Sequence, residues 1–129
     1  MVQEYRQAYD QATNDPAAFW LQAARDIHWD KAPRIALDDS RKPLYGWFPD
    51  GMLNLSANAL DRHVEAGRGE SAALVYDSAM LGTATTYSYS ELLREVEIFA
   101  GVLDGRGVKA GDRVLVYLPM IPQAAIAML

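Results

Sequence analysis

The chain has 129 residues, half of them hydrophobic and 22% charged, which is typical of one globular domain or a large piece of one rather than of a disordered chain. The absence of cysteine excludes a disulfide scaffold, a thiolate zinc site, an iron–sulfur cluster and a cysteine nucleophile. The net charge of −5 argues against a general nucleic-acid binder, because such proteins bind phosphates with lysine and arginine side chains.

Two helices are predicted at the start of the chain. Apolar residues recur at helical spacing over residues 2–13. A second helix is expected to begin at Pro16, because Asp15 can accept hydrogen bonds from its free amides and proline suits the first position. The apolar stripe of this helix is formed by Phe19, Trp20, Ala23, Ala24 and Ile27.

An irregular arm and a third helix are predicted next. Residues 29–51 contain three prolines and two glycines and predict an extended segment, with one short strand near residues 35–37. A helix is predicted over residues 53–66, with Gly67 as its left-handed terminator. The cap of this helix is expected to be Asn54 or Ser56.

The second half of the chain is predicted to alternate strand and helix. Residues 72–77 and 84–88 are expected to form a hairpin across a loop that ends in Gly82. Ser88 and Glu91 predict a capping box, in which each side chain covers the free amide of the other residue. A long helix follows and is ended by two glycines, Gly105 and Gly107.

A strand and a final helix are predicted at the end of the chain. Residues 113–119 are apolar without alternation, which is typical of a strand buried on both faces of a parallel sheet. Pro122 opens a helix that is apolar nearly all round and should therefore be buried. One hairpin and one central strand cannot cover both faces of a parallel sheet. We therefore expect this chain to be an α/β piece of a larger protein. The uncapped apolar end of the piece favours self-association.

The sequence contains no self-contained motif for nucleotide or ester chemistry. Residues 105–111 look like a phosphate-binding glycine loop, but they leave a helix and enter a strand, which is the reverse of the order such loops need. The favoured interpretation is a helix stop followed by a turn at Gly111 and Asp112. Neither a Walker-type loop nor a Gly-x-Ser-x-Gly elbow occurs.

The titratable side chains are interpreted as structural or solvated. Of the two histidines, His28 and His63, the second lies on a helix between arginine and valine and is interpreted as a structural residue that makes hydrogen bonds. Asp38 and Asp39 suggest a cation site, but adjacent acids in a loop are usually solvated, and we favour that reading. The same holds for Glu95 and Glu97. No catalytic, cofactor-binding or metal-binding residue is therefore predicted.

The sequence shows no sign of a membrane partner. Its apolar runs stay far below the ~20 residues that span a bilayer, and its polar N-terminus is not a secretory signal. The lack of cysteine also fits a reducing compartment, so the expected location is the cytoplasm.

Several stretches together resemble the acetyl-CoA and propionyl-CoA synthetases, short-chain members of the AMP-forming, adenylate-forming enzyme superfamily. The signature opening is WFPDGMLN at residues 47–54, followed by NALDRHVE at residues 58–65. The further blocks are DPAAFW (15–20), TYSYSEL (86–92), GVKAGDRV (107–114) and YLPMIP (117–122). The resemblance covers essentially the whole chain, and residues 68–70 and 73–78 are closer to the propionyl-CoA synthetases.

The resemblance implies that the parent enzyme joins a short carboxylic acid to ATP, releases pyrophosphate, and then exchanges AMP for coenzyme A. Mg²⁺ and basic residues would offset the charge on the phosphates. The resemblance also divides the chain into an N-terminal helical arm, residues 1–66, and the start of an AMP-binding α/β domain, residues 67–129. The family's phosphate loop, adenine pocket, ribose-binding aspartate and catalytic lysine lie downstream, so no site residue is carried over.

The signature side chains are expected to hold the arm and the domain together. They are Trp47, Asn54, Asn58, Asp61, Arg62 and His63.

Two hypotheses of function follow from the resemblance. The first is an N-terminal fragment of a propionyl- or acetyl-CoA synthetase that is inactive alone. The second is a stand-alone interaction or dimerisation module derived from such an enzyme. A small nucleotide-binding domain in its own right is disfavoured by the missing phosphate loop.

Overall fold

The computed structural model describes residues 2–129, with side chains from Glu4 onward, and it comprises two compact units. Unit 1 is Met1–Asn54 and unit 2 is Leu55–Leu129. Helices combined with small antiparallel sheets confirm the predicted α/β class. The predicted boundary between residues 66 and 67 concerns the domains of a larger enzyme and stays a prediction.

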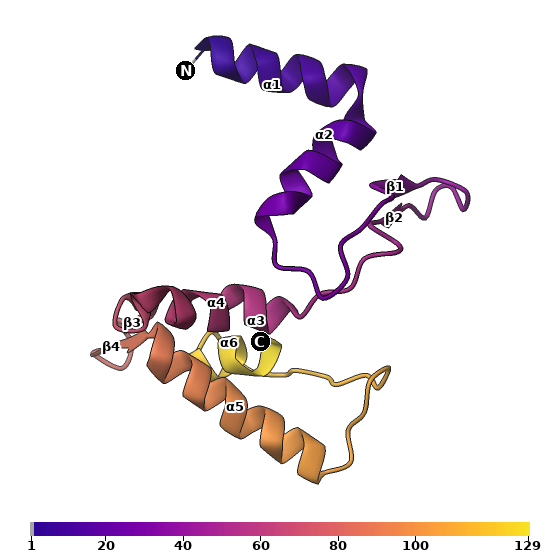
Figure 1. The fold of residues 1–129 in the computed structure, drawn as a ribbon. Coiled ribbons are helices and arrows are strands. Elements are labelled where there is room, and N and C mark those ends of the chain that lie inside the picture. Colours follow the sequence, from indigo (N-terminus) through magenta and orange to yellow (C-terminus); the bar gives the residue numbers. More distant parts are fainter. Residues whose placement is uncertain (1) are drawn as a thin grey trace. The chain divides into compact units, whose positions relative to one another are not determined.

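Unit 1 begins with two helices that meet at Asp15 (Figure 1). Helix α1 is Val2–Asn14, and α2 is Pro16–Ala23, extended by the 3-10 turn η1 at Ala24–Asp26. The backbone of Asp15 is not helical (φ −141°, ψ 75°), and its carboxylate accepts a hydrogen bond from the amide of Ala18 at 3.0 Å. The predicted helix start is therefore confirmed.

The arm of unit 1 forms one very short ladder and a chain of aromatic rings. Strands β1 (Leu37–Asp38) and β2 (Gly46–Trp47) pair antiparallel, which confirms a strand close to the predicted place. In the described part of unit 1 the buried residues are Ala24 and Ala36, both of which have small side chains. Ring centroids follow one another at 5.7 Å (Trp20–Trp47), 6.0 Å (Trp47–Phe48) and 5.6 Å (Phe48–Trp29).

Unit 2 opens with a helical segment that is interrupted at Leu60. It consists of α3 (Leu55–Ala59), α4 (Asp61–His63) and the π-helical turn η2 (Val64–Arg68). The prediction of one continuous helix over residues 53–66 is therefore wrong. Leu60 has φ −124° and ψ −65° and is only 2% exposed, so the helix breaks where this side chain enters the core. Gly67 has a φ of +77°, which confirms the predicted left-handed residue.

The hairpin and the long helix of unit 2 form as predicted. Strands β3 (Ala72–Ser78) and β4 (Thr83–Ser88) pair antiparallel. Helix α5 (Tyr89–Gly105) then begins with the predicted capping box. The Ser88 hydroxyl accepts from the Glu91 amide at 3.2 Å, and the Glu91 carboxylate accepts from the Ser88 amide at 2.9 Å.

The core of unit 2 lies between the hairpin, α3–α4 and the buried face of α5. Its buried residues are Leu60, Leu92 and Val96. Helix α6 (Pro122–Met128) lies beside α5 (Figure 1), and Ile126 packs against this core. Met128 is exposed, so α6 buries one face rather than being buried all round as its composition predicted.

The predicted strand over residues 113–119 is not formed. Within residues 2–129 the sheets are β1–β2 and β3–β4, and neither includes this segment. Leu115 and Tyr117 are 88% and 92% exposed. A parallel strand needs neighbouring strands for its backbone and cover for both faces, and the described residues supply neither. None of the helices within residues 2–129 is long and apolar enough to cross a bilayer.

Candidate functional site

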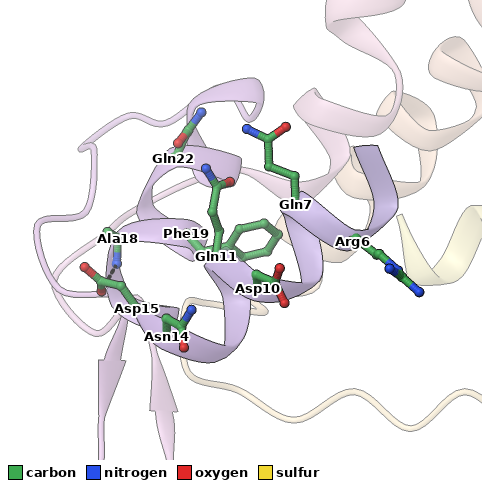
Figure 2. A pocket seen from close by; sticks show the side chains of 9 residues that line it. All are labelled: Arg6, Gln7, Asp10, Gln11, Asn14, Asp15, Ala18, Phe19 and Gln22. Carbon is green, nitrogen blue, oxygen red and sulfur yellow. Dashed lines mark hydrogen bonds between the residues drawn. The ribbon is translucent and has the colours of Figure 1, made fainter. Parts of the chain in front are cut away.

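A groove in unit 1 lies between α1 and α2 (Figure 2). It has a volume of about 690 Å³ and is open to solvent on one side. Side chains from both helices surround it, and most of them are amides or charged groups. They are Arg6, Gln7, Asp10, Gln11, Asn14, Asp15, Ala18, Phe19 and Gln22.

The lining of this groove contains no serine, threonine, lysine or histidine. The groups in it that could act as a base or a nucleophile are the carboxylates of Asp10 and Asp15. The carboxylate of Asp15 is already engaged as the cap of α2 (Figure 2). The groove is therefore a polar cleft whose lining pairs no hydroxyl, thiol or amine nucleophile with a base.

A second cluster in unit 1 is centred on Asp50. Its carboxylate accepts hydrogen bonds from the amides of Arg34 (3.1 Å) and Ile35 (3.2 Å) and from Nε of Arg34 (3.3 Å). The Asp50 side chain is 18% exposed. Burial alone would raise the pKa of Asp50, but the hydrogen bonds from the two amides and from the Arg34 side chain outweigh it and lower this pKa. Asp50 therefore fastens the WFPDG turn to the other side of the arm.

In unit 2, His63 interacts with residues from two neighbouring elements. Its Nδ1 lies 2.5 Å from Nη2 of Arg68, and its ring lies 4.7 Å from the ring of Tyr89. This confirms the prediction that His63 is a structural residue that makes hydrogen bonds. Burial is the main cause that lowers the pKa of His63, and the positive charges of Arg68 and Arg62 lower it further.

The glycine-rich segment after α5 is a turn, as predicted. Gly107 and Gly111 have φ values of +83° and +93°. The Asp112 carboxylate accepts from the Lys109 amide at 2.7 Å, and Lys109 Nζ pairs with Asp104 at 2.7 Å. The amides and the lysine of this segment thus close the turn on itself, whereas a phosphate loop would direct them towards a ligand.

The acidic pair Asp38 and Asp39 does not form a cation site with a third ligand. Asp38 accepts from the Ser40 amide at 3.0 Å, and hydrogen bonds with Ser40 are the main cause that lowers the pKa of Asp38. Asp39 forms an ion pair with Lys42 at 2.6 Å. No group of three or more histidine, aspartate or glutamate side chains that could hold a metal ion occurs in the part of the chain that the structure describes.

The signature residues are spread over both units. Trp47 lies in β2, Asn54 comes directly before α3, and the Asp61–His63 triplet forms α4. That they join arm and domain stays a prediction.

Two contacts were not predicted from the sequence: the Asp50 carboxylate with the backbone amides, and Arg68 with His63. The Pro–Asp–Gly turn could have indicated the contacts of Asp50. No helical spacing indicates the pair of Arg68 and His63, because a left-handed glycine lies between the two residues.

Two family models together cover nearly the whole chain. Residues 5–59 match the acetyl-coenzyme A synthetase N-terminus, and residues 60–129 match the AMP-binding enzyme model. Because the second match spans more than half of the residues, the chain belongs to the AMP-binding enzyme family.

Relatives with curated names are similar to the chain over almost its full length. The bovine protein named acyl-CoA synthetase short-chain family member 3, mitochondrial, is 45% identical over 126 residues, 98% of this chain and 18% of the relative. The acetyl-coenzyme A synthetase of Burkholderia lata is 46% identical over 125 residues, 96% of this chain and 19% of the relative. An uncharacterised Pseudomonas aeruginosa protein is 48% identical over 97% of this chain and 20% of its own length. The chain therefore spans about a fifth of the relatives that it matches.

Proposed function

We propose that this chain is the N-terminal part of an AMP-forming short-chain acyl-CoA synthetase. The observation that carries the proposal is that the two family models match in sequence order, the synthetase N-terminus first and the AMP-binding part second. Relatives named as short-chain acyl-CoA and acetyl-CoA synthetases align with nearly all of the chain. The alternative of a separate interaction module has no comparable support.

The proposed reaction has two steps. A carboxylate is a poor electrophile, so its oxygen first attacks the α-phosphorus of ATP, and pyrophosphate leaves with the electron pair of the broken bond. The thiol sulfur of coenzyme A then attacks the carbonyl carbon of the acyl-adenylate, loses its proton, and expels AMP. The proposed acid is propionate or acetate, and residues 68–70 and 73–78 resemble the propionyl-CoA synthetases more than the acetyl-CoA synthetases.

The proposed role of this chain is to support the reaction site without supplying its reacting groups. In residues 2–129 no group of three or more histidine, aspartate or glutamate side chains gathers that could hold a metal ion, and the groove between α1 and α2 pairs no hydroxyl, thiol or amine nucleophile with a base. No residue is therefore assigned to the Mg²⁺ that the family implies, and no step is routed through it. We accordingly propose that the 129-residue chain does not form acyl-adenylate by itself.

The test is a comparison of two proteins made from the same gene. The complete open reading frame that contains this chain should catalyse ATP–pyrophosphate exchange with propionate or acetate and form the CoA thioester. The 129-residue chain alone should give background exchange. Exchange by the short chain would refute its proposed inactivity, and a complete protein that adenylates no short acid would refute the proposed activity.

A further inference from the structure

His63 lies where three elements of unit 2 meet. It ends α4, it precedes the π-helical turn η2, and its ring packs on Tyr89, the first residue of α5, with 4.7 Å between centroids and an angle of 46°. Its Nδ1 lies 2.5 Å from Nη2 of Arg68, the last residue of η2. The imidazole therefore contacts residues that come before and after the hairpin.

The contact with Arg68 requires one protonation state of the histidine. A guanidinium nitrogen always carries protons and can only donate, so Nδ1 of His63 must be the acceptor. The imidazole is then neutral, with its proton on Nε2. A protonated imidazole has two donor nitrogens and cannot accept from Arg68.

Arg68 leads directly into the loop that holds the start of α5. The Gly69 carbonyl accepts from the Ser90 amide at 3.0 Å, and the Ser71 carbonyl accepts from the Tyr89 amide at 3.1 Å. The Ser71 amide in turn donates to the Arg68 carbonyl at 3.0 Å. Arg68 thus directly precedes the loop whose carbonyls accept both backbone bonds at the first turn of α5.

We propose that His63 is a pH-sensitive latch between the loop at residues 68–71 and the N-terminus of α5. In its neutral form the imidazole holds the Arg68 side chain and rests on the Tyr89 ring. On protonation it loses the hydrogen bond and adds a positive charge beside Arg68 and Arg62. The loop is then released from α5.

The groups around His63 favour this response. On its own segment the cations Arg62 and Arg68 act on the imidazole, and from α5 the Tyr89 ring faces it. The nearest carboxylate in the first turn of α5, Glu91, is bonded to the Ser88 amide in the capping box. The carboxylates of Asp61 and Glu65 are not among the causes that shift the pKa of His63. No neighbouring anion among these groups therefore stabilises the imidazolium.

The direction of the pH effect follows from the lowered pKa. The folded state binds fewer protons than the unfolded state, in which histidine has its ordinary pKa of about 6.5. The contribution of the latch is therefore complete above that value and is lost as the pH falls through the folded pKa. Acidification therefore breaks the contact between His63 and Arg68, and a pH above the ordinary histidine pKa of about 6.5 restores it.

The experiment follows the two histidines and the α5 amides of the whole chain by NMR between pH 8 and pH 5. His63 should titrate at a lower pH than in the urea-unfolded chain. Amide exchange at Tyr89 and Ser90, normalised to intrinsic rates, should become several-fold faster on acidification relative to the amides of β3. In the His63→Gln variant, whose amide oxygen accepts from Arg68 but cannot be protonated there, this pH dependence should disappear.

Two further variants separate the latch from a merely structural role. His63→Phe keeps an aromatic ring on Tyr89 without an acceptor and should show fast exchange at both pH values. His28→Gln should retain the full pH dependence. The proposal is overturned if His63→Gln keeps the wild-type pH dependence, or if the pKa of His63 is not lower in the folded chain. Both readouts use the wild-type and glutamine proteins, so they remain decisive even if His63→Phe does not fold.

Discussion

Units 1 and 2 are stabilised in different ways. In unit 2 apolar side chains recur at helical spacing and meet in one core, with Leu60, Leu92 and Val96 buried. In the described part of unit 1 the buried residues are two alanines, Ala24 and Ala36, and large rings remain partly exposed. The stability of unit 1 therefore depends on specific contacts rather than on the amount of apolar surface that it buries. These contacts are the edge-to-face packing of its aromatic rings and the hydrogen bonds of the Asp50 carboxylate to backbone amides.

The two units should therefore differ in where mutation destabilises them. A core of interlocking aliphatic side chains is weakened by any large-to-small change. An arm held by a few close contacts is sensitive at those contacts and tolerant elsewhere.

Truncation of the unit 2 core should have the largest effect. Leu92→Ala should lower the free energy of unfolding by about 2–5 kcal/mol, because a buried leucine leaves a cavity. The matched control on the same helix is Ile98→Ala, which removes an exposed side chain and should change this free energy by less than about 0.5 kcal/mol. Urea unfolding followed by circular dichroism measures both. Equal effects of the two variants would contradict the assignment of the core.

A single added methyl group should disturb unit 1. A Cβ at Gly51 would lie 2.7 Å from Cζ3 of Trp29 and 3.2 Å from Cβ of Pro33, so Gly51→Ala should cost about 1–3 kcal/mol. Gly101→Ala is the matched control, because nothing lies within 4 Å of its Cβ and alanine should stabilise the interior of α5 by about 0.5–1 kcal/mol. The midpoints of thermal unfolding should move in opposite directions. A neutral Gly51→Ala would argue against close packing of the arm.

The Asp50 cluster should give unit 1 an acid-dependent stability. Because hydrogen bonds lower the pKa of Asp50, its contribution is present above the unfolded-state pKa of about 3.9 and is lost as the pH falls through the folded value. Asp50→Asn should lower the urea midpoint at pH 7 and progressively less at lower pH. Fluorescence of the three tryptophans, all of which lie in unit 1, is the measurement.

The exposed Asp30→Asn serves as the control for Asp50→Asn, since its loss of charge should leave the urea midpoint unchanged. If the two variants behave alike at pH 7, the amide contacts of Asp50 do not hold the arm.

The exposed apolar segment of unit 2 should affect association but not folding. Combined Leu115→Lys and Tyr117→Lys substitutions remove two almost fully exposed apolar side chains and should reduce concentration-dependent association without changing the unfolding midpoint. Met80→Lys, at the exposed tip of the hairpin, is the control. Light scattering over a concentration series measures the effect. A wild-type chain that stays monomeric at high concentration would remove the basis for this prediction.

The parts of the fold that depend on local signals were predictable. Asp15 before Pro16, the pair Ser88 and Glu91, and Gly67 each satisfy or relax backbone groups within a few residues, so the sequence pattern is sufficient. The expectation that His63 makes a hydrogen bond was confirmed, although its partner Arg68 had no local signal.

The errors fall where distant residues decide the conformation. The helix breaks at Leu60, whose side chain enters a core in which the other buried residues, Leu92 and Val96, lie more than thirty positions later. Residues 113–119 have the composition of a buried strand, but a strand exists only where neighbouring strands accept and donate its backbone bonds. The residues that Asp50 holds lie on another part of the arm, so sequence spacing could not identify them.

Local patterns specify the helix starts, the hairpin, the capping box and the left-handed Gly67, and the order of short motifs carries the resemblance to the adenylate-forming synthetases. All of these depend on backbone preferences and on the order of short motifs. The tertiary structure alone decided which apolar side chains share a core, where the helix of residues 55–68 breaks, and which base or acid meets which partner. The core and the contacts of Asp50 depend on the burial and charge of groups far apart in the chain, which local patterns do not encode.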